Sequence, residues 1–144
     1  MGHKRSKGKQ VYPDVYRMYW RGDMVCVEIY ETAEAMHERA GQVGAKIGKN
    51  VGAYHVFMVG NRKATYGKCK SVIVLHERRS GAGTLAHEFT HAALAWFGHR
   101  KGWNGVLPKR YKRIGWDRQE EQLCGMVGEL SRRFWCQWYG RRKK

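Results

Sequence analysis

Three residues have the types and spacing to do chemistry together: His87, Glu88 and His91, in the pattern H-E-x-x-H. The surrounding residues 84–97 are helix-forming and mostly apolar all round, as in a buried helix, and Gly98 predicts the end of that helix. Histidines four residues apart on a helix share one face, with Cβ atoms about 5 to 6 Å apart, so both imidazoles can bind one metal ion. Glu88 is rotated by about 100° from His87 and can reach a water on that metal without binding the metal. The pattern therefore predicts zinc-dependent hydrolysis, with His87 and His91 as zinc ligands and Glu88 as the catalytic base that activates the zinc-bound water.

The alternative is that these three residues belong to an ordinary helix. The two histidines would then have backbone or carboxylate partners, and Glu88 would form a surface ion pair. A mostly apolar helix is an unfavourable place for two imidazoles and a carboxylate unless they act together. We therefore favour the metal site.

A catalytic zinc normally has three protein ligands, so another part of the chain must supply one. The metzincin pattern would need a histidine at position 97, which is occupied by Phe97. The last helix of the chain offers Glu120 and Glu121 instead. Helix phase alone permits either glutamate, and Glu120 can also form a capping box with Asp117 at the start of that helix.

An H-E-x-x-H helix followed by E-x-x-(small residue) on a later helix resembles the gluzincin-type zincin metallopeptidases. In style it is most similar to small metallopeptidase-like proteins of phages and prophages, whose later helix reads E-x-L-A-x-L-V-G-x-L. On that outline the glutamate is Glu121 and the small residue is Cys124, where alanine is usual. The resemblance covers residues 72–130 and implies that Glu121 is the third zinc ligand, with Zn²⁺ as the cofactor. It also implies a zinc metallopeptidase that hydrolyses peptide bonds in a protein or peptide substrate.

The elements around the motif predict one α+β domain, since 144 residues are too few for two ordinary domains. We expect a single-domain zincin-like fold, in which a small mixed sheet packs against the H-E-x-x-H helix and a C-terminal helix. The domain should span residues 11–139, with basic tails at residues 1–10 and 140–144. The expected elements are strands at 11–20 and 24–30, a helix at 32–49, paired strands at 54–59 and 71–75, the helix at 84–97 and a final helix from 117 onward.

The zincin plan adds two further expectations. The strand over residues 71–76 should be an edge strand that borders the cleft and pairs with an extended peptide. An oxyanion formed during hydrolysis needs a nearby hydrogen-bond donor, for which the candidates are His55, His76, Tyr54 and Tyr111. Each of these four side chains could equally have an ordinary structural partner.

The net charge of +16 comes from 28 Lys and Arg residues against 12 Asp and Glu residues. Such an excess favours an acidic partner, and in several segments the cations alternate with aromatic residues, as in single-stranded nucleic-acid sites. The candidate nucleic-acid contacts are Lys109, Arg110, Lys112 and Arg113. The alternative function is therefore a basic nucleic-acid-binding protein on a zincin-like scaffold, with zinc structural or with proteolysis directed at nucleic-acid-bound proteins.

The remaining sequence features bear on location. No apolar run approaches the roughly 18 residues that span a bilayer, and the first ten residues lack the apolar stretch of a signal peptide. The four cysteines form no C-x-x-C pair, which favours reduced thiols. We expect a cytoplasmic protein of a bacterium or a phage-infected cell, without a membrane partner.

Overall fold

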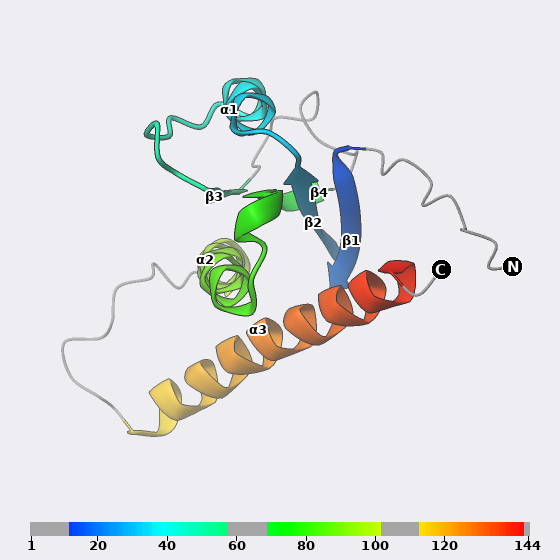
Figure 1. The fold of residues 1–144 in the computed structure, drawn as a ribbon. Helices are drawn as coiled ribbons and strands as arrows, with labels where there is room; N and C mark the ends of the chain where they lie inside the picture. The colour runs from blue at the N-terminus through cyan, green and yellow to red at the C-terminus, as the bar shows by residue number, and fades with distance from the viewer. Residues whose placement is uncertain (1–11, 58–68, 102–112, 143–144) are drawn as a thin grey trace, which may run out of the picture.

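The computed structural model describes residues 12–57, 69–101 and 113–142, except for the side chains of residues 100, 101, 113–120 and 142. In this part of the chain one four-stranded sheet and three α-helices form a single α+β domain (Figure 1). The strands are β1 (Asp14–Trp20), β2 (Asp23–Tyr30), β3 (Ala53–Phe57) and β4 (Cys69–His76), and the helices are α1 (Ala33–Gln42), α2 (Ala82–Lys101) and α3 (Arg113–Arg142). A 3₁₀ turn, η1 (Glu77–Arg79), joins β4 to α2. Among the described helices, none combines the length and apolarity needed to cross a membrane.

The strands lie in the order β1-β2-β4-β3. β1 and β2 form an antiparallel hairpin, in which Arg21 and Gly22 both have positive φ angles, of 47° and 86°, as a tight two-residue turn requires. β2 runs parallel to β4, and β4 pairs with β3 in the antiparallel sense. The expectation that residues 71–76 form an edge strand is therefore wrong, because β4 lies between β2 and β3. The edge strand on that side of the sheet is β3.

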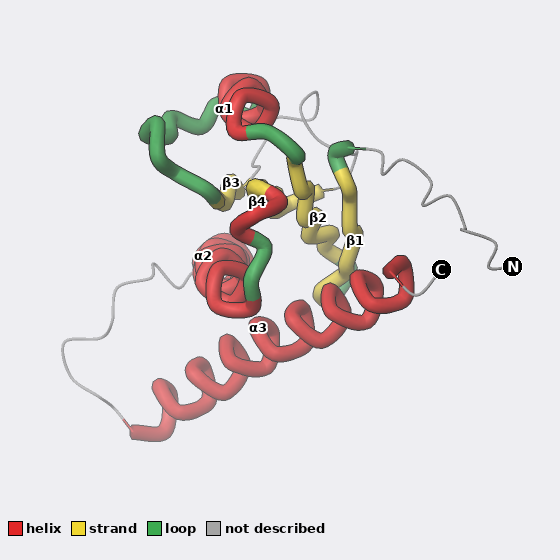
Figure 2. The backbone as a smooth tube through the Cα atoms, viewed as in Figure 1, coloured by secondary structure: helices red, strands yellow, loops and turns green. Residues whose placement is uncertain are grey.

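The helices cover the two faces of the sheet (Figure 2). Helices α2 and α3 lie on one face and α1 lies on the other, in agreement with the two separate core clusters. Side chains of β2 alternate accordingly: Val27 and Ile29 belong to the core cluster under α2 and α3, whereas Cys26 belongs to the cluster under α1. The predicted pairing of the strands near residues 54–59 and 71–75 is confirmed.

Helix boundaries differ from the sequence expectation in three places. α1 ends at Gln42 rather than near residue 49, and Gly44 then adopts a positive φ of 73°, which favours glycine and stops the helix. α2 continues through Gly98 to Lys101. α3 begins at Arg113, so positions 117 and 120 lie inside the helix and do not form the predicted capping box at its start. At its other end α3 runs to Arg142, three residues beyond the expected end of the domain.

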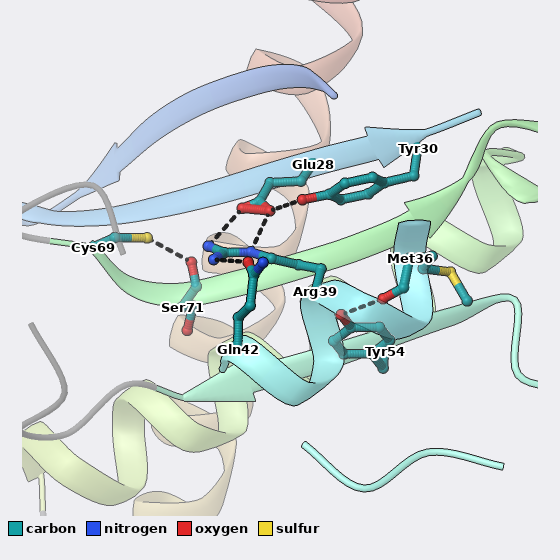
Figure 3. A network of polar contacts seen from close by, with 8 residues as sticks. All are labelled: Glu28, Tyr30, Met36, Arg39, Gln42, Tyr54, Cys69 and Ser71. Atoms are coloured by element: carbon teal, nitrogen blue, oxygen red, sulfur yellow. Dashed lines mark hydrogen bonds and ion pairs between the residues drawn. The ribbon is translucent and has the colours of Figure 1, made fainter. Parts of the chain in front are cut away.

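A buried polar network attaches α1 to the sheet (Figure 3). The Glu28 carboxylate is fully buried on β2 and accepts hydrogen bonds from Arg39 Nε at 2.8 Å and Nη2 at 3.1 Å. The Tyr30 hydroxyl donates to the same carboxylate at 2.9 Å. On β3, the Tyr54 hydroxyl donates to the Met36 carbonyl oxygen of α1 at 3.1 Å. These contacts satisfy groups whose burial would otherwise be unfavourable.

Candidate metal centre

Helix α2 presents its two motif histidines on an open face. Leu85, Phe89 and Ala92 are buried in the core, whereas His87 and His91 are exposed. The helix is therefore amphipathic, and the expectation of a helix buried all round is wrong. The spacing of four residues places both imidazoles on one side of α2, as the sequence predicts.

The two imidazoles converge on each other. His91 Nε2 lies 3.1 Å from His87 Nε2, and the ring centroids are 4.7 Å apart at an angle of 79°. Two nitrogen ligands at 2.0 to 2.1 Å from a tetrahedral zinc would be about 3.3 Å apart. The two nitrogens thus have nearly the separation that one zinc ion requires, so this pair of residues fits a shared metal.

Glu88 lies beside the histidine pair but is withdrawn from solvent. Only 5% of its surface is exposed. Burial raises the pKa of the Glu88 carboxyl above its ordinary value, and the nearby His91 and His87 oppose that rise. A carboxyl group in such surroundings suits proton exchange better than a fully solvated one does.

His55 on β3 is the third imidazole at this place. Its ring stacks on His91 with centroids 6.5 Å apart and an interplanar angle of 7°. Its Nε2 atom lies 3.0 Å from the Ser71 hydroxyl oxygen on the neighbouring strand β4. Burial lowers the pKa of His55 to about 4, with the nearby His91 as a second cause, so the ring is neutral at physiological pH.

Two other candidates for an oxyanion donor, His76 and Tyr54, do not meet the histidine pair. His76 Nδ1 accepts a hydrogen bond from the Arg78 amide at 3.1 Å and so caps η1. Tyr54 is buried toward α1, on the face of the sheet opposite to α2. Tyr111 lies outside the described residues. Of the three candidates that the structure describes, only His55 faces α2.

Ser71 was not identified from the sequence, although a signal was present. Strand β4 alternates, and Ser71, Ile73 and Leu75 occupy the same face. A serine in an otherwise apolar inward series needs a hydrogen-bond partner, because a buried hydroxyl without one is costly. The partner is His55, and only the pairing of β3 with β4 identifies it.

Among the described residues, no third metal ligand lies with His87 and His91. Glu121 is exposed on α3, and no group of three His, Cys, Asp or Glu side chains in the described part of the chain is arranged to hold a metal ion. The side chain of Glu120 lies outside the described residues. The structure therefore brings together His87, Glu88 and His91, and does not bring Glu121 to them.

The side chains of the candidate nucleic-acid contacts lie outside the described residues. This holds for Lys109, Arg110 and Lys112, and for the side chain of Arg113, whose backbone begins α3. The four cysteines are unbridged thiols: two are buried in the sheet and two are exposed on α3.

Comparison with known proteins found no match, whether to a protein-family model, to a curated protein or to a solved structure.

Proposed function

We propose that this protein is a zinc metallopeptidase with a zincin-like arrangement of its active-site helix. The observation that carries the proposal is the convergence of His87 Nε2 and His91 Nε2 at 3.1 Å, with the buried carboxyl of Glu88 beside them. Two neutral nitrogen donors and one adjacent carboxyl group are what metal-assisted hydrolysis needs from a helix. The resemblance to gluzincin-type metallopeptidases supports the same function.

The start of α3 would supply the third ligand. The resemblance assigns Glu121, and helix phase leaves Glu120 as the alternative. The positions one and two turns after Glu121 are Cys124 and Gly128, and both are exposed. Position 120 instead precedes Leu123 and Val127 by three and seven residues, and both of these pack against the core under α2 and α3. This burial pattern favours Glu120, whereas the sequence resemblance favours Glu121.

Each residue of the site has a distinct task. Zinc, when bound, supplies a Lewis acid that makes water a nucleophile near neutral pH and polarises a substrate carbonyl. His87 and His91 would hold the ion through their Nε2 atoms. Glu88 would accept a proton from the nucleophilic water and donate a proton to the departing amine, so that the C–N bond of the peptide breaks as the new C–O bond forms.

Strand β3 offers a place for the substrate. The other edge of the sheet is covered, because Arg133 and Gln137 of α3 donate hydrogen bonds to the Tyr19 and Arg17 carbonyl oxygens of β1. In the described part of the chain no strand pairs with the outer edge of β3. An extended peptide that added to β3 would lie beside the strand that carries His55, which stacks on His91.

Metal analysis tests the site, and one substitution tests the mechanism. We expect about one zinc per chain in the wild type, loss of zinc in His91→Ala, and loss in whichever of Glu120→Ala and Glu121→Ala removes the third ligand. Glu88→Gln should retain zinc and lower the rate of hydrolysis of an unfolded protein substrate by at least about 100-fold, because it removes the group that transfers the proton. Absence of zinc from wild type prepared with excess metal would overturn the proposal. Full activity of Glu88→Gln would overturn the mechanism.

Nucleic-acid binding is a second candidate function, and the distribution of charge favours it. Residues 100–118 contain seven Lys and Arg residues and a single acidic residue, Asp117. Four of the seven, Lys109, Arg110, Lys112 and Arg113, lie within five consecutive positions. Such a cluster is typical of phosphate binding.

A further inference from the structure

Strand β3 directs one row of side chains at α2. Ala53, His55 and Phe57 occupy alternate positions on the strand and therefore share a face. Ala53 packs against the core under α2 and α3, and the Phe57 ring lies 5.5 Å from the ring of His99 at the far end of α2. His55 is the middle residue of this row, and the proposed peptidase mechanism gives it no task.

The His55 ring is held at one end. Its Nε2 atom is 3.0 Å from the hydroxyl oxygen of Ser71, and Ser71 is only 1% exposed on the interior strand β4. Since β4 has a neighbouring strand on each side, this anchor belongs to the most constrained part of the sheet. A hydrogen bond to such an anchor restricts rotation of the imidazole about its side-chain bonds.

The His55 ring also stacks on the ring of His91. The two rings are nearly parallel, at 7°, with centroids 6.5 Å apart, although His91 itself is exposed to solvent. An exposed histidine normally samples several rotamers, and ordering it on metal binding costs conformational entropy. A flat, fixed neighbour on one side reduces that cost.

We propose that His55, anchored by Ser71, is a positioning residue that holds the His91 imidazole in the orientation in which its Nε2 atom faces His87. The inference rests on the proposed function, because it takes His91 to be a metal ligand. His55 acts through His91 and does not bind the metal: its Nε2 atom is engaged by Ser71, and within the described residues no three donor groups are arranged around a common ion.

The test compares the zinc affinity of single variants by competition with a chelator. His55→Ala should weaken zinc binding by about 10- to 100-fold, the range typical of residues that orient metal ligands. His55→Phe keeps a flat ring but loses the hydrogen bond to Ser71, and Ser71→Ala loses the same bond, so both variants should produce a loss intermediate between those of the wild type and His55→Ala. The matched control is His76→Ala, a histidine on the neighbouring strand that contacts η1 instead of α2, and its zinc affinity should equal that of the wild type. Thermal unfolding should show that each variant is folded.

A second measurement does not depend on zinc. Imidazole NMR spectra of the metal-free protein should show a single ring orientation for His91 in the wild type and exchange between several orientations in His55→Ala, because the ring then loses its stacked neighbour. If this difference is found in a protein that binds no zinc, the positioning role stands and the peptidase proposal fails. Wild-type zinc affinity and an unchanged His91 spectrum in His55→Ala would overturn the positioning role. Loss of zinc in His55→Phe as complete as in His91→Ala would overturn it too, because His55 would then be a ligand.

Discussion

Glu88 shows how strongly a single position depends on its surroundings in this molecule. It differs from His87 by one residue, yet it is buried whereas His87 is exposed. The reason is the rotation of about 100° per residue in a helix, which turns Glu88 toward the core side of α2.

Glu28 is a second residue whose surroundings decide its importance. Its carboxylate is fully buried and is balanced by Arg39, whose side chain is 11% exposed. We predict that Arg39→Met lowers the free energy of unfolding by about 3 to 5 kcal/mol, because it leaves a buried charge without its partner. Urea unfolding followed by circular dichroism measures this change. Arg132→Met removes an exposed ion pair with Glu129 and should leave the unfolding free energy nearly unchanged. Equal losses in the two variants would show that the Glu28 pair is not effectively buried.

Helix α3 both packs in the core and covers one edge of the sheet. Its buried side chains Phe134 and Trp138 pack against Tyr16 of β1, with Phe134 only 5.0 Å from the Tyr16 ring. Gln137 and Arg133 also cover the outer edge of β1, which protects an edge strand from pairing with other chains. The helix therefore closes one edge of the sheet and leaves β3 at the other.

The link between α3 and β1 should respond to acid through Glu129. Hydrogen bonds from Arg132, which has the larger effect, and from Arg133 lower the pKa of Glu129 to about 2. Arg133 also donates a hydrogen bond to the Tyr19 carbonyl oxygen of β1. Because the folded pKa lies below the ordinary value of about 4.5, these pairs stabilise the fold fully above pH 4.5 and less as the pH falls toward 2. Because these pairs are exposed, their contribution is small: we predict that Glu129→Gln melts only slightly below the wild type at pH 6, and that this small difference closes between pH 4.5 and pH 2. A difference independent of pH would contradict this assignment.

The types of most helices and strands were predicted correctly from the sequence, whereas some of their ends and neighbours were not. Short runs of apolar and β-branched residues correctly predicted β2, β3 and β4, helical spacing of apolar residues predicted α1 and α3, and a run of helix-forming residues predicted α2. The end of α2 was predicted too early, because the glycine at position 98 is tolerated within a helix whose preceding turn, Trp96 and Phe97, is buried. The edge position expected for β4 is wrong because its sequence does not show that β2 pairs with it across more than 40 residues.

Across the whole molecule, charge is unevenly distributed along the chain. The described side chains are close to neutral in sum, so the net charge of +16 comes from the other positions. Residues 100–118 contain seven Lys and Arg residues against one acidic residue, so long-range attraction of an anionic partner would act strongly through this segment.

Charge reversal tests whether the basic residues between positions 109 and 113 bind nucleic acid. We predict that changing Lys109, Arg110, Lys112 and Arg113 to Glu strongly weakens binding of a single-stranded DNA oligonucleotide at low salt, and that the salt slope of the remaining affinity falls by about 0.7 for every phosphate that the protein no longer neutralises. Fluorescence anisotropy at several salt concentrations measures both. Glu substitution at the exposed residues Lys46, Lys49, Arg78 and Arg79 lowers the net charge equally and should leave most of the affinity. Equal losses in the two variants would show that total charge, and not this cluster, binds the DNA.

The H-E-x-x-H face of α2, the α+β class and the type of most elements could be predicted from the order of the amino acids, because each depends on contacts between residues close in the chain. The order of the strands, the edge position of β3 and the contact of His55 with Ser71 and His91 could not, because they depend on long-range packing. His55 and His91 are 36 positions apart, and their rings meet because β3 pairs with β4 and α2 packs on the same face of the sheet. Local periodicity carries no information about such pairings, whereas burial of both sheet faces selects them.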